Sequence, residues 1–291
     1  MVSWFAAYAA FAVGIHFLSG PAHRLPGYLP FELACLLPWN IVLFVKAARR
    51  GAAVAIAVLV TTCFVMVVTY PAHIITTLNL HWAYFQDQDV LIGPMLAGVP
   101  IEEFLFYPMT INLAVLIYLV MCGFMKERRL ADFPLSRGSL RAVLLGGAAV
   151  FALLGIWLIA SGNPGSVAPA ARSWDTFGLP HYSEGPRTRG WTILCMFSAA
   201  SNLVLLWLAE LFTPMTLRAV VPTAALYLPV CLLVDLIGTS RGWWVFNAQT
   251  SSGLWIGPLP VEELPMYLTG VMLSISVFET TRRLLGERGL P

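Results

Sequence analysis

The sequence predicts an all-α integral membrane protein, with about eight transmembrane helices arranged as two parallel four-helix repeats. Of 291 residues, 58% are hydrophobic and only 11% are charged, whereas soluble globular chains average about 25% charged residues. Gly51 to Gln86 contains no Asp, Glu, Lys or Arg, and a membrane-spanning helix needs about 20 apolar residues. Motifs in the first half of the chain also return about 160 residues later, and fixed-period self-similarity indicates repeated structural units.

Eight apolar segments are the expected helices. The first lacks the basic start of a signal peptide, so we interpret it as a membrane helix. A polar connection rich in Gly, Pro and Ser, Ser161 to Gly190, follows the fifth segment and is expected to be a loop. The segments are Val2–Leu18, Tyr28–Val45, Ala52–Tyr70, Val99–Met125, Leu140–Ala160, Trp191–Leu211, Leu217–Ile237 and Leu259–Phe278.

The distribution of basic residues predicts how the chain is oriented. Eight spans place both termini on one side of the membrane, and 12 of the 17 Lys and Arg residues then lie on that side. The positive-inside rule therefore predicts a multi-pass cell-membrane protein with both termini in the cytoplasm. The net charge of +2 and the lack of a dense basic tract exclude nucleic acid as a partner.

The repeat divides the chain into residues 1–130 and 131–291. Trp82 to Gln86, followed by Gly98 to Phe104, is echoed by Trp243 to Asn247, followed by Leu259 to Leu264. With four helices in each half, the two halves have the same orientation, so equivalent motifs meet on the same face. We expect the two halves to build one site between them.

Each repeat carries Pro-x-Glu-Glu at the expected start of an apolar helix, and its acids are the candidate catalytic residues. A single Glu-Glu pair could simply mark a helix start at the membrane interface, where carboxylates are favourable. Two pairs in register favour a function, because a charge near the membrane costs several kcal/mol unless it is paired, wet or neutralised. Adjacent helical residues point about 100° apart, so one Glu of each pair can face a cavity while the other braces it. The four acids are Glu102, Glu103, Glu262 and Glu263.

Four carboxyls around one partly dry site cannot all ionise cheaply, so we expect a neutral carboxylic acid beside a carboxylate, which is an acid/base pair. An acid beside aromatic faces suits protonation of an alkene, because aromatic rings stabilise the resulting cation. The same aromatic residues could also form a belt at the membrane interface, where Trp and Tyr are enriched, and this interpretation is compatible with a role in binding a cation. Asp235 could orient a catalytic Glu or pair with Arg241. The candidate substrate-binding residues are Trp82, Tyr84, Phe85, Trp243, Trp244, Phe246 and Asp235.

The repeated Pro-x-Glu-Glu motif preceded by a Trp-rich segment resembles the lycopene cyclase domain of bacterial, archaeal and fungal carotenoid cyclases, in its fused two-repeat form. The resemblance implies an isomerase of the intramolecular lyase type. It closes the ψ-end of lycopene into a β-ionone-type ring by acid-initiated, redox-neutral chemistry without a cofactor. It also implies a carotenoid or other isoprenoid substrate within the bilayer, contact with membrane lipid, and association with a second copy or with other carotenoid enzymes. Pro265 departs from the expected pattern and could kink the second helix after its acids.

Other functions are less well supported by the sequence. No GxGxxG or Walker motif is present, and His73 and His81 lack a third ligand, so no metal site is expected. Neither Lys46 nor Lys126 lies mid-helix, where a retinal Schiff base would be needed, and clustered Asp motifs for magnesium diphosphate are missing. A transporter or lipid-handling protein remains an alternative, because intramembrane acids also mark ion pathways. A cyclase that acts on a different isoprenoid is a second alternative.

Overall fold

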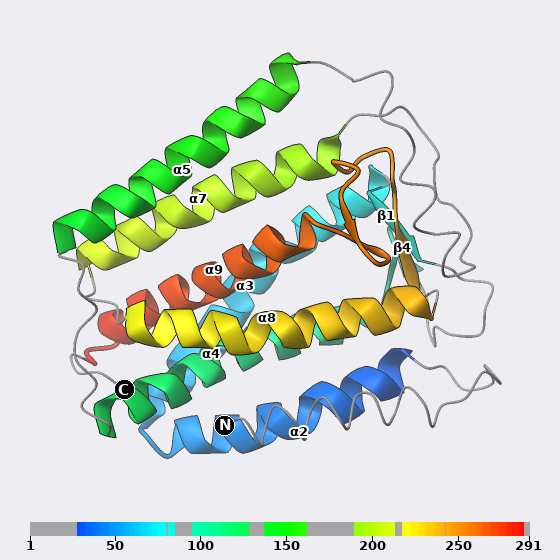
Figure 1. The fold of residues 1–291 in the computed structure, drawn as a ribbon. Coiled ribbons are helices and arrows are strands. Elements are labelled where there is room, and N and C mark those ends of the chain that lie inside the picture. The colour runs from blue at the N-terminus through cyan, green and yellow to red at the C-terminus, as the bar shows by residue number, and fades with distance from the viewer. Residues whose placement is uncertain are drawn as a thin grey trace.

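The computed structural model describes residues 28–79, 81–84, 95–127, 137–161, 189–212, 217–241 and 243–287. This part of the chain contains seven helices and six short strands (Figure 1). The helices are α2 (Tyr28–Ala48), α3 (Ala52–Leu78), α4 (Glu103–Glu127), α5 (Arg137–Ala160), α7 (Gly190–Phe212), α8 (Leu217–Ser240) and α9 (Glu263–Leu284). The strands are β1 (Trp82–Tyr84), β2 (Met95–Leu96), β3 (Val99–Pro100), β4 (Trp244–Phe246), β5 (Trp255–Ile256) and β6 (Leu259–Pro260).

Seven of the eight expected helices are present in the described residues. The first expected helix, Val2–Leu18, lies outside them, as does nearly all of the polar connection between α5 and α7. The order of elements from α2 to α4 (helix, helix, strand, two-stranded hairpin, helix) recurs from α7 to α9. Eight helices in two four-helix repeats therefore remain a prediction, while the recurring order of elements is observed.

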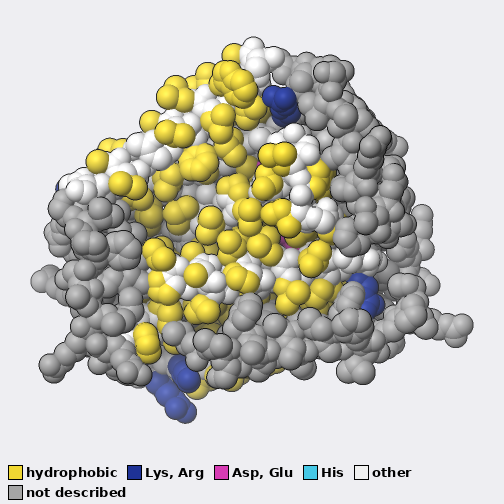
Figure 2. All heavy atoms as spheres, viewed as in Figure 1, with side chains coloured by type: hydrophobic (Ala, Val, Ile, Leu, Met, Phe, Trp, Pro, Cys, Tyr) yellow, Lys and Arg dark blue, Asp and Glu magenta, His cyan; other side chains and the backbone are white. Residues whose placement is uncertain are grey.

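Six of the seven helices are long and apolar enough to cross a membrane. Apolar side chains cover the middle of the face drawn in Figure 2, and Lys and Arg side chains lie near its edges. α9 is the exception, although we expected it to be apolar, because it carries Thr, Ser, Glu and Arg side chains. It packs against α3, α4, α7 and α8, so much of its surface faces protein instead of lipid.

Two of the expected helices begin later than their apolar segments suggested, and the fold is not purely helical. Val99–Pro100 and Leu259–Pro260 are strands, each paired in a two-stranded antiparallel hairpin, with Pro100 opposite Met95 and Pro260 opposite Trp255. The two prolines were expected in a first helical turn. They lie instead in edge positions of these hairpins, where a missing N–H is tolerated.

Pro265 lies in the first turn of α9. It is the third residue of the helix that begins at Glu263, and the N–H groups of the first turn have no partner within the helix. The missing N–H of Pro265 therefore removes no hydrogen bond within the helix, so this position gives no reason for the kink that we expected.

α4 and α9 form the centre of the helix bundle. They contact each other, α4 also packs against α2, α3 and α8, and α5 packs along α7 on the outside. The helices run side by side between two ends of the molecule, and the strands gather at the end where α4 and α9 begin (Figure 1). There β1 and β4 pair antiparallel, with Ala83 opposite Val245. The two aromatic segments, far apart in sequence, are thus joined directly.

Candidate active site

A cavity of about 820 Å³ runs between α3, α7 and α9 and reaches the β1–β4 pair. Its lining is mostly apolar, and it extends from Glu103 and Glu263 at one end to Leu284 at the other. The 21 helical steps from Glu263 to Leu284 span about 31 Å at 1.5 Å per residue. The cavity is therefore shaped for a long, thin, apolar molecule.

The second Glu of each repeated pair lines this cavity. Glu103 and Glu263 are the first residues of α4 and α9, and their side chains are only 3% and 6% exposed. The Tyr28 hydroxyl donates a hydrogen bond to Oε1 of Glu103, and Nε1 of Trp191 donates to Oε1 of Glu263 at 3.1 Å. Each cavity-facing carboxyl is thus held by an aromatic donor from the start of α2 or α7, and Glu103 also interacts with the Tyr84 hydroxyl.

The first Glu of each pair is buried but does not line the cavity. Glu262 accepts hydrogen bonds through Oε1 from the Thr192 hydroxyl and from the backbone N–H of Ser252, both at 2.5 Å. It therefore ties the start of α9 to α7 and to the loop before β5. This arrangement follows the 100° rotation between neighbouring helical residues, which sends the two side chains of a pair in different directions.

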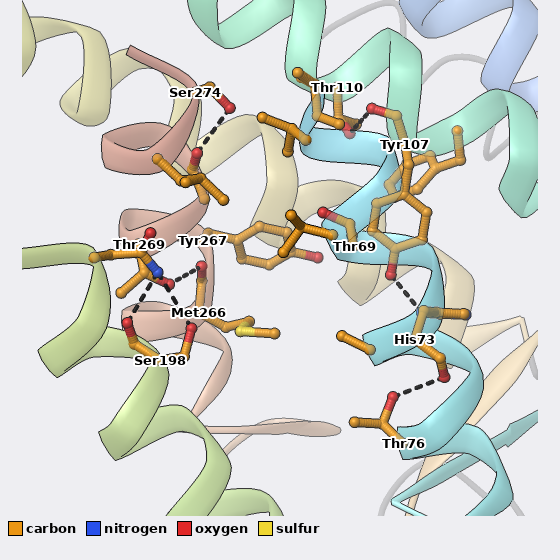
Figure 3. A pocket seen from close by; sticks show the side chains of 18 of the residues that line it. Thr69, His73, Thr76, Tyr107, Thr110, Ser198, Met266, Tyr267, Thr269 and Ser274 are labelled. Atoms are coloured by element: carbon orange, nitrogen blue, oxygen red, sulfur yellow. Dashed lines mark hydrogen bonds between the residues drawn. The ribbon is translucent and has the colours of Figure 1, made fainter. Parts of the chain in front are cut away.

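A second layer of polar groups lies beside the carboxyls, on α3, β1, α4, α8 and α9. In the first half, the Tyr107 hydroxyl is 2.5 Å from Nδ1 of His73, and the Tyr84 hydroxyl is 3.0 Å from Nε2 of the same ring. In the second half, the Tyr267 hydroxyl donates to Oδ2 of Asp235 at 2.5 Å. Figure 3 shows Tyr107 and His73 on the α3 side of the pocket, with Tyr267 on the opposite side. Every ring in this layer is therefore held in place by a hydrogen bond.

These polar groups occupy equivalent places in the two segments. Tyr107 and Tyr267 each follow a cavity-facing Glu by four residues, which places both on the same helix face one turn on. His73 and Asp235 occupy matching positions on α3 and α8, so a neutral or cationic group in one half corresponds to an acid in the other. The two sides of the cavity therefore have polar groups at matching positions, but the chemical types of these groups differ.

Aromatic rings from both segments enclose the carboxyl end of the cavity. Trp82, Tyr84, Trp244 and Phe246 all line it. The Tyr28 ring lies 5.3 Å from Trp244 between centroids, and Trp82 meets Trp191 edge-on at 4.8 Å. Two of the predicted aromatics differ from this pattern. Trp243 packs behind Tyr28, with centroids 5.4 Å apart, and Phe85 lies outside the described residues.

The electrostatic character of the cavity is acidic. Its described lining includes Glu103, Asp235 and Glu263 but no Lys or Arg. No cluster of three or more potential metal ligands occurs in the ranges that the structure describes. Three acids beside aromatic faces can donate a proton, accept a proton and stabilise a cation between these two events.

Sequence reasoning did not find all of the residues around the acids. Tyr28 and Trp191 were missed because each lies more than 70 residues before the Glu that it contacts, so only the folded chain brings them together. Tyr107 and Tyr267 could have been found, because both recur four residues after the repeated Glu. Asp235 was expected to orient a Glu or to pair with Arg241, and it accepts a hydrogen bond from the Tyr267 hydroxyl, a partner that sequence reasoning did not name.

The fold and the site define an α-helical membrane protein with an elongated apolar cavity that has acids and aromatic rings at one end. The family model for lycopene cyclase matches residues 28–121 and 189–281, which are the two segments with the same order of elements. The chain belongs to the lycopene cyclase family.

Three fungal relatives are named bifunctional lycopene cyclase/phytoene synthase. They come from Podospora anserina (25% identical, over 68% of this chain and 31% of the relative), Leptosphaeria maculans (29%, 75% and 34%) and Colletotrichum graminicola (28%, 75% and 33%). This chain thus spans about a third of the length of these relatives. No solved structure matches it.

Proposed function

We propose that this protein is a carotenoid cyclase that closes the ψ-end of lycopene, or of a related acyclic isoprenoid, into a β-ionone-type ring. The observation that carries the proposal is the placement of Glu103 and Glu263 at one end of the long apolar cavity, walled by aromatic rings. Membership in the lycopene cyclase family and the names of the fungal relatives support the same substrate class.

The reaction is an isomerisation and consumes no reductant or oxidant. One cavity carboxylic acid adds its proton to the terminal double bond, which leaves a tertiary cation. The electrons of a neighbouring double bond then form the carbon–carbon bond of the six-membered ring, and the positive charge moves to a ring carbon. The other carboxylate removes a ring proton and restores a double bond, so the product has the same atoms as the substrate and no cofactor is needed.

The aromatic wall protects the cation while the ring closes. Trp82, Trp244 and Phe246 present their rings to the carboxyl end of the cavity, and a cation over a desolvated aromatic face gains about 2 kcal/mol. Exclusion of water matters equally, because water would capture the cation as an alcohol. The buried positions of these rings serve both requirements.

The shape of the cavity bears on the order of events. Its acids lie at one end and its lining continues for about 31 Å along α9, where Ser and Thr side chains alternate with apolar ones, so an extended chain places one terminus at the acids and the rest along the helix. The two termini of a linear substrate therefore react in separate binding events. A product with one ring is an expected intermediate.

We further propose that the segments 1–130 and 131–291 are parallel repeats in the cell membrane with both chain ends in the cytoplasm. The recurring order of elements and the antiparallel pairing of β1 with β4 support this arrangement. Association with membrane lipid, with a second copy of the chain or with other carotenoid enzymes is part of the same proposal.

The test is expression in a bacterium that accumulates lycopene, with separation of the extracted pigments by chromatography. We expect monocyclic and bicyclic carotenes from the natural chain, and lycopene alone from the Glu103→Gln and Glu263→Gln variants. Glu287→Gln is a control, because Glu287 is a half-buried acid outside the cavity lining. Unchanged lycopene with well-expressed natural protein would contradict the proposal and favour another isoprenoid or a transport function.

A further inference from the structure

Glu32, on α2, is a buried acid that the mechanism above does not use. Its side chain is 0% exposed, and neither carboxyl oxygen forms a hydrogen bond of ordinary geometry in the described part of the chain. A buried polar group without a partner costs free energy, so such a group in a folded protein calls for an explanation. Glu32 does not line the cavity, so direct contact with the substrate does not explain it.

The surroundings of Glu32 connect it to the active site. It follows Tyr28 by four residues on α2, so the two side chains lie on the same face of the helix, one turn apart. The Tyr28 hydroxyl donates to Glu103. The groups that act on the Glu32 carboxyl are Glu103 and Glu102, from the start of α4, and the Tyr28 hydroxyl, which interacts with it as a hydrogen-bonding side chain. Glu32, Tyr28 and Glu103 therefore form a row that ends in the cavity.

The second half has no counterpart to this row. Around the position that corresponds to Glu32, α7 has Leu194 and Cys195. Cys195 is the group that interacts with Glu263 and Glu262 there, and it is a thiol instead of a carboxylic acid. Glu263 is held by Trp191, whose indole N–H donates a hydrogen bond but cannot relay a proton. Glu263 does have a second acid beside it, Asp235, but the hydroxyl that binds Asp235 belongs to Tyr267 and not to the Trp191 that holds Glu263. Among the described residues, Glu103 is thus the cavity carboxyl that is linked to a second acid through the hydroxyl that holds it.

We infer that Glu32 is a positioning residue that returns a proton to Glu103 through the Tyr28 hydroxyl after each turnover. This inference rests on the proposed function and divides its two roles: Glu103 is the acid that protonates the substrate, and Glu263 is the base that removes the ring proton.

The relay neither gains nor loses protons over one turnover. Glu103 loses its proton to the less substituted carbon of the terminal double bond and becomes a carboxylate. Tyr28 then gives its hydroxyl proton to Glu103 and takes one from Glu32, and Glu32 regains a proton from water. Glu263 releases to water the proton that it took from the ring. Each turnover thus takes one proton from water and returns one to it.

The test compares a single turnover with steady-state turnover in purified Glu32→Gln protein, with lycopene in liposomes as the substrate. With enzyme in excess, Glu103 enters the reaction already protonated, so the first ring should form at the natural rate. With substrate in excess, the rate should fall by about a hundredfold, the lower end of what a positioned proton donor contributes. Glu32→Asp keeps a carboxyl and should recover much of the loss.

The control is Cys35→Ala, which changes a buried residue of the same helix outside the cavity lining. Its single-turnover and steady-state rates should both equal those of the natural protein. Two results would overturn the inference. Unchanged rates in Glu32→Gln would show that no proton passes through Glu32, and equal loss of both rates would show that it only supports the structure. Cyclisation by Glu103→Gln protein would instead remove the acid from the proposed function, so the two failures are distinguishable.

Discussion

Replacing Gly238 by Ala should disable the site although Gly238 does not line the cavity. A Cβ atom at Gly238 would lie 2.5 Å from Cζ3 of Trp244 and closer still to two further carbons of the ring. To restore an ordinary contact of 3.4 Å at Cζ3, the ring must move by about 0.9 Å, and more at the other two atoms. The Trp244 ring lines the cavity and packs on Tyr28, which holds Glu103.

A displacement of this size at a wall of the site has a large expected effect. A misplacement of about 1 Å can lower a rate by about a hundredfold, while overpacking costs about 1 to 3 kcal/mol of stability. We therefore expect Gly238→Ala protein to fold, to melt at a lower temperature, and to cyclise lycopene about a hundredfold more slowly. The assay is pigment formation by purified protein in liposomes, followed by chromatography, together with a thermal melt.

Gly146→Ala is the matched control. Gly146 also lies within a helix, and a Cβ atom there meets nothing within 4 Å, so this variant should keep its activity and gain up to about 1 kcal/mol of stability. If Gly238→Ala protein were as active as Gly146→Ala protein, the packing of Trp244 would not control the geometry of the acids. The argument that links this ring to Glu103 would then be wrong.

Three further predictions concern other contacts. Trp191→Phe removes the donor to Glu263, and since a hydrogen bond to a charged group contributes about 1.5 to 3 kcal/mol, steady-state assays should show turnover lowered by about tenfold to a hundredfold. Glu279→Gln removes the negative charge from the buried 2.7 Å ion pair with Arg282, so denaturation should show a loss of about 1.5 to 3 kcal/mol; full stability would contradict this. Burial lowers the pKa of His81 to about 4 from 6.5, so the unfolded chain binds more protons between these values and stability falls as the pH drops from 6.5 to 4. Thermal melts of His81→Gln protein should fall less over that range, and an identical pH profile would refute the assignment.

The sequence was a good guide to the helices because a membrane helix is a long apolar run, and composition alone reveals such a run. It was a poor guide to the strands. β3 and β6 contain two residues each, which is too short for any periodicity, and each merges with the apolar run of the following helix. α9 was placed correctly, although its polar side chains could be explained only once its packing among four other helices was visible.

The site was partly predictable for a similar reason. The repeated Glu pairs and aromatic segments stand out because a duplicated pattern is visible in one sequence. Which Glu of each pair faces the cavity depends on the rotation of α4 and α9, and that rotation is fixed by hydrogen bonds to Tyr28 and Trp191. These partners come from distant helices, so no local pattern in the sequence contained them.

The measurement that tests the central claim most directly is isotope incorporation during one round of cyclisation. The purified protein is equilibrated in D₂O, supplied with less lycopene than enzyme, and the product is analysed by mass spectrometry. Acid-initiated ring closure predicts a product that carries one deuterium for each ring formed and is otherwise isomeric with lycopene. A cyclic product without deuterium, or one that has gained or lost hydrogen, would contradict proton-initiated, redox-neutral cyclisation by the two carboxyls.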